Sequence, residues 1–360
     1  MARRGRWSLA VAAVLVLVAA LGWGTLRGSP ARELRPRAPA SPPPLAHVFV
    51  IVMENQSAGL LLQNPAAPYI RYLVRHYGYD SQYYGVTHPS LPNYVALIAG
   101  RTFGSHSDNP GQRFFGPTLP GQLTQRGISW LAVMQSLPTP GYRGAWYPAG
   151  AAGQEIPSTL YAEKHDPFML FPGLWKQDAH HVVPLRMLAA DLRSGRVPAL
   201  VFLVPNLCDD MHGQPSGPGA VCPASRGALL VRDGNDFLAR WIPIIMHSRA
   251  WGRSSVIFVL WDEAGGGGSL NPQALRSYLA AGPEAPYITA ALPFLGRLGG
   301  GRVPLIVIAG GVEGPRRVAL WADHYSVLKT IETAWHLPRL GHARAAAVPL
   351  LTPLLSPTGP

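Results

Sequence analysis

Five short apolar runs, rich in β-branched residues, constrain the fold of this chain more than any other feature. They are continuous rather than alternating in polarity, and they cover residues 48–53, 128–134, 199–204, 256–261 and 303–309. Continuous runs of this length are typical of strands buried on both faces, as in a parallel sheet. Helix-like stretches lie between them, at residues 69–77, 94–99, 185–192, 237–247 and 325–335. The alternation predicts an α/β layered fold.

The first 45 residues predict a targeting segment followed by a spacer. Arg3, Arg4 and Arg6 precede an apolar run over residues 9–23, the order found in signal peptides. The run is intermediate in length between a secretory segment and a spanning helix, so residues 1–25 are predicted to be a signal peptide or a signal anchor. The positive-inside rule then places the rest of the chain outside the cytoplasm, secreted or on the outer face of the cytoplasmic membrane. Residues 26–45 are predicted to be a Pro/Arg-rich linker, residues 46–345 the globular domain and residues 346–360 a C-terminal tail.

The net charge of +12, from 31 Lys+Arg and 19 Asp+Glu, favours anionic partners such as phosphate groups, anionic lipids or nucleic acid. The basic residues are scattered, with no run of five or more and no recognised nucleic-acid motif. A specific nucleic-acid partner is therefore not expected, and a basic surface that aids solubility explains the charge equally well.

The chain has two cysteines, Cys208 and Cys222. In an exported chain they can form a disulfide, which would close a short Gly/Pro-rich loop; paired free thiols are the alternative. Two cysteines are too few for a cysteine-based zinc site.

Polar residues lie just beyond three of the apolar runs. After the runs over 48–53, 199–204 and 256–261 these are, in order, Glu54, Asn55, Asp209, Asp210, His212, Asp262 and Glu263. In open α/β sheets, ligands bind outside the carboxyl ends of the strands. Carboxylates that converge there repel each other unless a cation or protons compensate, and oxygen and imidazole ligands suit a divalent metal. Each group alone has an ordinary explanation, as a helix cap, a solvated loop or a surface histidine, but three groups at three strand ends favour a metal site.

Two further segments place polar residues at predicted helix starts. Pro92 suits the first turn of a helix, which puts Ser90 at or just before the N-terminus. The N–H groups and dipole there would stabilise a serine alkoxide or a bound phosphate. From the pattern alone, an N-cap role for Ser90 is the simpler explanation. Asp323 is predicted to cap the helix over 325–335, but capping does not account for His324 beside it.

Together these segments resemble the bacterial phosphoesterase family that includes acid phosphatases and phospholipases C, within the alkaline-phosphatase-like superfamily. The matching segments occur in the family's order, at residues 50–55, 88–94, 164–168, 205–212, 261–263 and 324–332. The resemblance implies a three-layer α/β/α fold with a mainly parallel central sheet. It also implies that residues 46–345 are the catalytic domain of a metal-dependent hydrolase of phosphate mono- or diesters, with a phospholipid as one candidate substrate.

The resemblance implies a role for each matching residue. Ser90 would be the nucleophile, forming a phosphoseryl intermediate that water then hydrolyses, with His212 and His324 as further catalytic residues. Substrate-binding residues would be Asn93, Lys164 and His165. The implied ligands of a divalent metal are Glu54, Asn55, Ser90, Asp262 and Glu263, with Asp210 as an additional candidate because the spacing around it differs between subfamilies.

One departure from the family concerns the stretch over residues 264–301. Many relatives have an Asp-His pair shortly after the equivalent of Asp262 and Glu263, whereas here four glycines are followed by Ser269, Leu270 and Asn271. This favours one metal site over two, or an insert that sets specificity. A non-catalytic, membrane-anchored module that kept the fold is the alternative function, and the intact set of implied site residues argues against it.

Overall fold

The computed structural model describes residues 41–265 and 299–356. The predicted signal segment, residues 26–40 of the predicted linker and most of the stretch over 264–301 lie outside these ranges. The described residues belong to one unit that begins at Ser41. Within them, no helix has the length and apolar character needed to cross a membrane.

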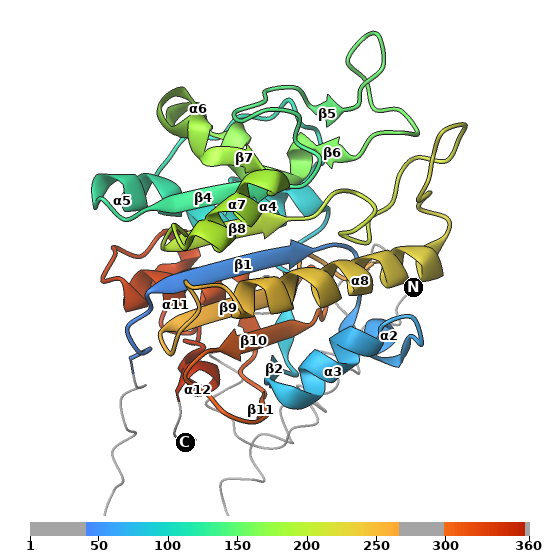
Figure 1. The fold of residues 1–360 in the computed structure, drawn as a ribbon. Coiled ribbons are helices and arrows are strands. Elements are labelled where there is room, and N and C mark those ends of the chain that lie inside the picture. Colours follow the sequence, from blue (N-terminus) through green and yellow to red (C-terminus); the bar gives the residue numbers. More distant parts are fainter. Residues whose placement is uncertain (1–40, 266–298, 357–360) are drawn as a thin grey trace, which may run out of the picture. The chain divides into compact units, whose positions relative to one another are not determined.

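An eight-stranded sheet forms the centre of the fold, in the order β11-β2-β10-β9-β1-β8-β4-β7 (Figure 1). In its middle, β1 (His47–Met53) pairs in parallel with both β8 (Leu200–Val204) and β9 (Ser255–Trp261). On one side, β4 (Trp130–Met134) pairs in parallel with β8 and with β7 (Val182–Pro184). Every residue of β4, β8 and β9 is buried, which is why these runs are continuously apolar.

On the other side of the sheet, β10 (Leu305–Ala309) pairs antiparallel with β9 and with β2 (Gly78–Asp80). The edge strand β11 (Arg316–Val318) runs parallel to β2. The sheet is therefore mainly parallel, as predicted, and β10 is the one strand of this sheet that runs against the others. A continuous apolar run indicates burial on both faces but not direction, so the sequence could not reveal this reversal.

Helices cover both faces of the sheet (Figure 1). On one face lie α7 (Leu185–Ser194) and α8 (Gly227–Met246), and α3 (Pro68–His76) packs against α8. On the other lie α4 (Ser90–Ala99) and α11 (His324–Ala334), which pack against each other. Every residue of α4 is buried. The three-layer α/β/α architecture predicted from the resemblance is confirmed.

Shorter elements complete the described part. The helices among them are α2 (Ala58–Gln63), α5 (Leu119–Gln125), α6 (Pro172–Asp178) and α12 (Thr352–Leu355), and the 3₁₀ turns are η1 (Glu163–His165), η2 (Pro167–Leu170), η3 (Ala179–His181) and η4 (Gly341–Arg344). Two small ribbons pair β3 (Tyr83–Tyr84) with β12 (Ala322–Asp323) and β5 (Trp146–Tyr147) with β6 (Tyr161–Ala162). Beyond residue 345, α12 buries Leu354 and Leu355.

The helix α8 begins ten residues before the predicted start at residue 237. The prediction missed this first half because it contains a glycine, which lowers helix propensity. That glycine has a packing role. A Cβ on Gly234 would lie 2.6 Å from Cγ of Met211 and 2.9 Å from the carbonyl oxygen of Asp209. Helix α8 can therefore approach the loop after β8 closely only with glycine at this position.

Glu332, buried in α11, makes the fold sensitive to pH. Its Oε1 accepts a hydrogen bond from the N–H of Leu340 at 2.8 Å, and burial raises its pKa from 4.5 to about 8. A raised carboxyl pKa means that the folded state binds a proton that the unfolded state releases, so stability falls as pH rises from about 4.5 to about 8.

We expect Glu332→Gln to unfold with a free energy about 1–3 kcal/mol above that of the wild type near pH 8.5, with the difference vanishing near pH 4. Urea unfolding at several pH values measures it. Glu313→Gln, at an exposed position, is the control. Parallel stability curves for Glu332→Gln and the wild type would contradict this assignment.

Candidate functional site

The carboxyl ends of the three central strands meet at Glu54, Asp210 and Asp262. The N–H of Glu54 donates to the carbonyl oxygen of Asp210 at 2.8 Å. The N–H of Asn55 donates to Oδ1 of Asp262 at 3.0 Å. All three carboxyl groups are fully buried. The parallel pairing of β1 with β8 and β9 thus gathers acidic residues that lie far apart in the sequence.

Asn55 turns the chain at the end of β1. Its φ of 54° lies in the left-handed region, which asparagine adopts more easily than most residues. This turn aims the backbone N–H at Asp262. On the opposite side, a Cβ on Gly85 would lie 2.6 Å from the carbonyl oxygen of Asp262, so glycine is required there. The backbone around Asp262 is therefore held tightly from two directions.

Ser90 is the first residue of α4, as predicted. The N-cap residue is Pro89, and no side chain caps this helix, so the N-cap role considered for Ser90 is wrong. Instead, its Oγ donates to Oε2 of Glu54 at 3.0 Å. The serine hydroxyl therefore points into the carboxylate cluster from the N-terminus of a ten-residue helix.

His165 lies between two of the carboxyl groups. Its Nε2 is 3.1 Å from Oε1 of Glu54, and its Nδ1 is 3.2 Å from Oδ2 of Asp210. The ring of Tyr94, from α4, stacks on the imidazole with a centroid separation of 5.2 Å and an interplanar angle of 12°. Glu54 is thus shared, with one oxygen facing Ser90 and the other facing His165.

Lys164 and His212 form a second polar pair beside this cluster. The ammonium of Lys164 donates to Nε2 of His212 at 2.9 Å, and Nδ1 of His212 donates to the carbonyl oxygen of Gly213 at 2.8 Å. Burial, followed by the charge of Lys164, lowers the pKa of His212 to about 4. In this arrangement His212 is neutral and accepts a hydrogen bond at Nε2, so it offers no proton to a leaving group.

His324 has both ring nitrogens engaged by the protein. Its Nε2 donates to the carbonyl oxygen of Asp262 at 2.6 Å, and its Nδ1 accepts from the hydroxyl of Tyr83 at 2.8 Å. Burial lowers the pKa of this histidine to about 4. The arrangement makes His324 a positioning residue for Asp262.

The predicted cap of α11 by Asp323 is confirmed, because its side chain and Ser326 form a capping box.

Asn93 has an amide that is fully used within the chain. Its Oδ1 accepts from the N–H groups of Val86 and Thr87, and its Nδ2 donates to the carbonyl oxygens of Thr87 and Pro89. The side chain therefore fixes the loop that leads into Ser90, and it does not reach toward the cluster as a phosphate ligand would.

Glu263 is a predicted metal ligand. Its Oε2 lies 2.8 Å from Nδ1 of His88. This contact joins the loop after β9 to the segment that precedes Ser90. His88 belongs to the matching segment over 88–94, but its pattern does not indicate a separate role for it.

The electrostatics of the cluster require compensation. Burial, followed by the neighbouring carboxylates, raises the pKa of Glu54 far above its usual value; burial also raises the pKa values of Asp210 and Asp262. One carboxyl oxygen of each makes no hydrogen bond of good geometry, although those of Glu54 and Asp210 lie 3.1 and 3.2 Å from the ring nitrogens of His165. Ligand atoms of Glu54, His165 and His212 lie within 4.8 Å of one another. Orphaned carboxyl oxygens beside neutral imidazoles are a donor set that fits a divalent cation.

The model of the Phosphoesterase family matches residues 60–338, more than half of the chain. The chain belongs to the Phosphoesterase family. It hydrolyses phosphoester bonds, the activity common to the family and to its named relatives.

Two curated relatives of this phosphoesterase carry the names of different phosphatases. A phosphatidylinositol-3-phosphatase of Mycobacterium tuberculosis is 27% identical over 306 residues, which are 84% of this chain and 81% of that protein. An acid phosphatase of Aspergillus fumigatus is 26% identical over 264 residues, which are 72% of this chain and 49% of that protein.

A solved structure supports the fold of the phosphoesterase. It is a protein in the alkaline phosphatase superfamily from Vibrio parahaemolyticus, which aligns with a TM-score of 0.50 and 13% identity over 85% of this chain and 72% of that one. The alkaline-phosphatase-like fold predicted from the resemblance is confirmed.

Sequence reasoning missed Asp108. Its Oδ1 accepts from the N–H of Leu91, the residue after Ser90, at 3.0 Å, and its Oδ2 accepts from Lys164 at 2.9 Å. Asp108 lies in a long loop between α4 and α5 rather than at a strand end, so neither periodicity nor a matching segment could indicate it.

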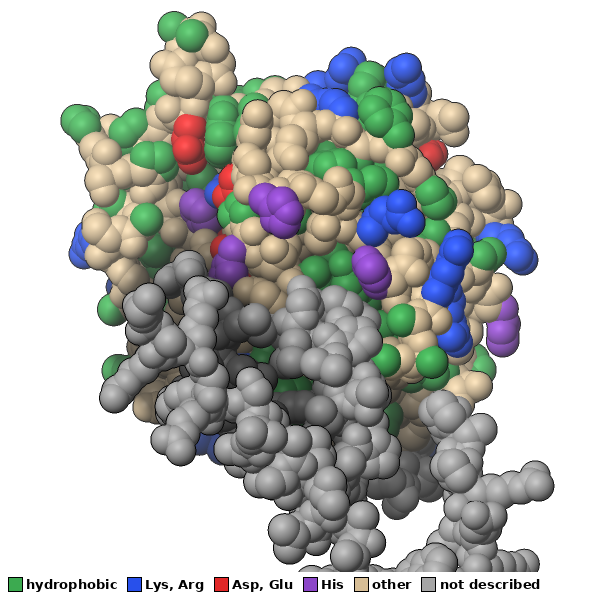
Figure 2. All heavy atoms as spheres, turned by 180° about the vertical axis from the view of Figure 1, so that it is seen from behind, with side chains coloured by type: hydrophobic (Ala, Val, Ile, Leu, Met, Phe, Trp, Pro, Cys, Tyr) green, Lys and Arg blue, Asp and Glu red, His purple; other side chains and the backbone are tan. Residues whose placement is uncertain are grey.

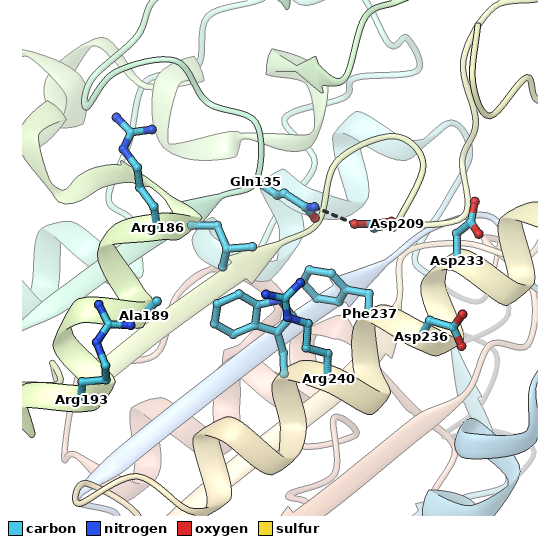
Figure 3. Close-up of a pocket in the computed structure, with 11 residues that line it drawn as sticks. Gln135, Arg186, Ala189, Arg193, Asp209, Asp233, Asp236, Phe237 and Arg240 are labelled. Carbon is cyan, nitrogen blue, oxygen red and sulfur yellow. Dashed lines mark hydrogen bonds between the residues drawn. The ribbon is translucent and has the colours of Figure 1, made fainter.

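A cavity of about 670 Å³ lies between α7 and α8, and none of the predicted site residues lines it (Figure 3). Asp209, the neighbour of Asp210 in the sequence, does line the cavity and accepts a hydrogen bond from Gln135 at 2.6 Å. Arg186 and Arg193 line the cavity from α7, and Arg240 lines it from α8. On the opposite face of the molecule, histidine and acidic side chains lie close together in one area, whereas basic side chains are spread over several places (Figure 2).

The disulfide between Cys208 and Cys222 is formed, as the sequence permitted. It closes the loop that carries Asp210 and His212. We expect Cys208→Ser/Cys222→Ser to lower the free energy of unfolding by about 3 kcal/mol, because a loop of this length regains its chain entropy when opened. Urea unfolding measures it, and the reduced wild type should match the double variant. Equal stability of the oxidised and reduced wild type would contradict the expectation.

Proposed function

We propose that this chain is an exported, metal-dependent phosphoesterase that hydrolyses phosphate mono- or diesters, of acid phosphatase or phospholipase C type, through a phosphoserine intermediate at Ser90. One observation carries the proposal. Ser90 is the first residue of a buried helix, and its hydroxyl donates to Glu54 within a cluster of three fully buried carboxyl groups, those of Glu54, Asp210 and Asp262. A purely structural role for Ser90 would not require several carboxyl groups to be buried together, which costs free energy.

Glu54, Asn55, Ser90 and Asp262 would hold a divalent metal, and Glu263 and Asp210 are the remaining ligands of the predicted set. When bound, the metal supplies positive charge that lowers the pKa of the serine hydroxyl and offsets charge on the phosphoryl oxygens. Ligand atoms of His165 and His212 lie near Glu54 and are the further donors available in the described residues.

The chain's own residues account for the remaining requirements. Oε2 of Glu54 is placed to accept the proton of Ser90 Oγ as that oxygen attacks phosphorus. Carboxylates around Lys164 raise its pKa in spite of its burial, so it stays charged and can bind a phosphate oxygen. The serine–phosphorus bond forms as the ester bond breaks, and the leaving alkoxide takes a proton from solvent and departs as the alcohol. Water then hydrolyses the phosphoserine, which releases phosphate from a monoester substrate or a phosphate monoester from a diester substrate and restores Ser90.

Export and a lipid substrate belong to the same proposal. The basic and apolar N-terminal segment and the disulfide support a location outside the cytoplasm. The net charge of +12 and the similarity to a phosphatidylinositol-3-phosphatase support a phospholipid among the substrates. Anchoring through residues 1–25 is the membrane attachment that we propose.

The test is hydrolysis by the full chain of p-nitrophenyl phosphate, its phosphorylcholine ester and bis-p-nitrophenyl phosphate, with divalent metals and with chelator. We expect turnover that chelator abolishes, and the preferred ester distinguishes phosphatase from phospholipase. A folded, metal-saturated protein that hydrolyses none of them would contradict the proposal and favour the non-catalytic module.

A further inference from the structure

Two hydrogen-bond donors beside Ser90 are engaged by one carboxylate. The N–H of Leu91 donates to Oδ1 of Asp108 at 3.0 Å, and Nζ of Lys164 donates to Oδ2 at 2.9 Å. The side chain of Lys164 is only 7% exposed, whereas that of Asp108 is 32% exposed. The carboxylate therefore approaches a buried ammonium from the side that solvent reaches.

These two donors, which we call the anion position, are of the kind that binds phosphate oxygens. A backbone N–H in the first turn of a helix and a buried ammonium both favour negative charge. Leu91 follows Ser90 directly, and the Ser90 hydroxyl is 3.0 Å from Oε2 of Glu54, whose second oxygen lies 3.1 Å from Nε2 of His165. A phosphate held at Ser90 would place its oxygens among these same groups. Each carboxylate oxygen of Asp108 accepts a hydrogen bond from one of these two donors, and two oxygens of a phosphate could accept from them in the same way.

We propose that Asp108 is an intramolecular competitor for the phosphate group at this site. A phosphate that binds at Ser90 takes over the N–H of Leu91 and the ammonium of Lys164 from the Asp108 carboxylate. The inference rests on the proposed function, because it takes Ser90 as the place where phosphate binds. Since Asp108 adds negative charge beside the anion position, it weakens the binding of a doubly charged phosphate more than that of a singly charged one.

Asp108→Asn separates competition from a tethering role. Asparagine keeps an oxygen that can accept from the N–H of Leu91, but it lacks the negative charge that Asp108 places beside the ammonium of Lys164. If Asp108 competes, inorganic phosphate binds about tenfold more tightly to the variant, the effect expected when one charge-assisted hydrogen bond no longer has to be broken. If Asp108 only holds Lys164 in place, phosphate binds more weakly. The two roles predict opposite signs.

The measurement is calorimetric titration of inorganic phosphate into the full chain saturated with a divalent metal. A second measurement compares KM for p-nitrophenyl phosphate, which is doubly charged near pH 8, with KM for bis-p-nitrophenyl phosphate, which is singly charged. We expect the first KM to fall more than the second in Asp108→Asn. Glu155→Gln is the matched control, because Glu155 is another carboxylate whose charge acts on Lys164. We expect it to change phosphate affinity by less than about twofold, since Glu155 is partly exposed and screened.

Unchanged or weaker phosphate binding by Asp108→Asn would overturn the inference. Its melting temperature is measured alongside, and Asp108→Ser, whose hydroxyl can also accept from Leu91, replaces it if the asparagine variant does not fold. Tighter phosphate binding by the variant, together with a wild type that hydrolyses no ester, would keep the anion position and reject the proposed function. Ester hydrolysis by the wild type, together with weaker phosphate binding by the variant, would keep the proposed function and reject competition by Asp108.

Discussion

Replacing Ser90 by alanine is expected to lower kcat by about 10³-fold or more for every ester that the wild type hydrolyses. The variant loses the oxygen that would form the bond to phosphorus and that donates to Glu54. The fold should survive, because alanine removes one hydroxyl group and adds no volume to the buried site. Steady-state kinetics with p-nitrophenyl phosphate and its diester, with melting temperatures for both proteins, measure the effect.

Ser194→Ala is the matched control for that experiment. Ser194 is exposed at the end of α7, and its hydroxyl donates only to the carbonyl oxygen of Asp191. We expect its kinetics to equal those of the wild type. Full turnover by Ser90→Ala would keep the hydrolase but reject Ser90 as the nucleophile.

Replacing Asp262 by asparagine is expected to remove metal binding and to lower kcat by about 10³-fold as well. Asparagine can still accept from the N–H of Asn55 through Oδ1, so the turn after β1 is preserved. It removes the negative charge whose burial raises the pKa of Asp262. Without metal, the variant should therefore be more stable than the wild type near pH 8, where the buried wild-type carboxyl group tends to ionise at a cost.

Thermal unfolding with and without a divalent metal tests this second prediction. Metal that binds only the folded state raises the melting temperature of the wild type, and it should leave that of Asp262→Asn unchanged. Asp209→Asn is the control, since Asp209 faces Gln135 and the cavity between α7 and α8. A wild type whose melting temperature no metal raises, while chelator leaves its activity intact, would contradict a metal at this cluster.

The sequence predicted the sheet and the meeting of its strand ends because burial on both faces leaves a continuous apolar signal. The central strands, β1, β8 and β9, carry that signal, and each is followed by an acidic residue. Parallel pairing then brings Glu54, Asp210 and Asp262 together without any further information. The direction of β10 was not predictable, since an apolar run has the same pattern in either direction.

The contacts of single side chains were not predictable in the same way. A family resemblance identifies His324 and Asn93 but not their partners, and the structure pairs them with Asp262 and with the loop before Ser90. Asp108 left no signal at all, because it reaches the site through a tertiary contact from an irregular loop. Local pattern places residues on elements, but hydrogen-bond partners depend on how those elements pack.

The most direct test of the central claim, a phosphoserine intermediate, is the partition of that intermediate between water and an added alcohol. The full chain hydrolyses p-nitrophenyl phosphate and phenyl phosphate in glycerol-containing buffer, and the ratio of glycerol phosphate to inorganic phosphate is measured for each; if only diesters are substrates, two diesters with one common group replace them. A common intermediate at Ser90 predicts the same ratio for both leaving groups. A ratio that changes with the leaving group would contradict the intermediate and require direct attack by water.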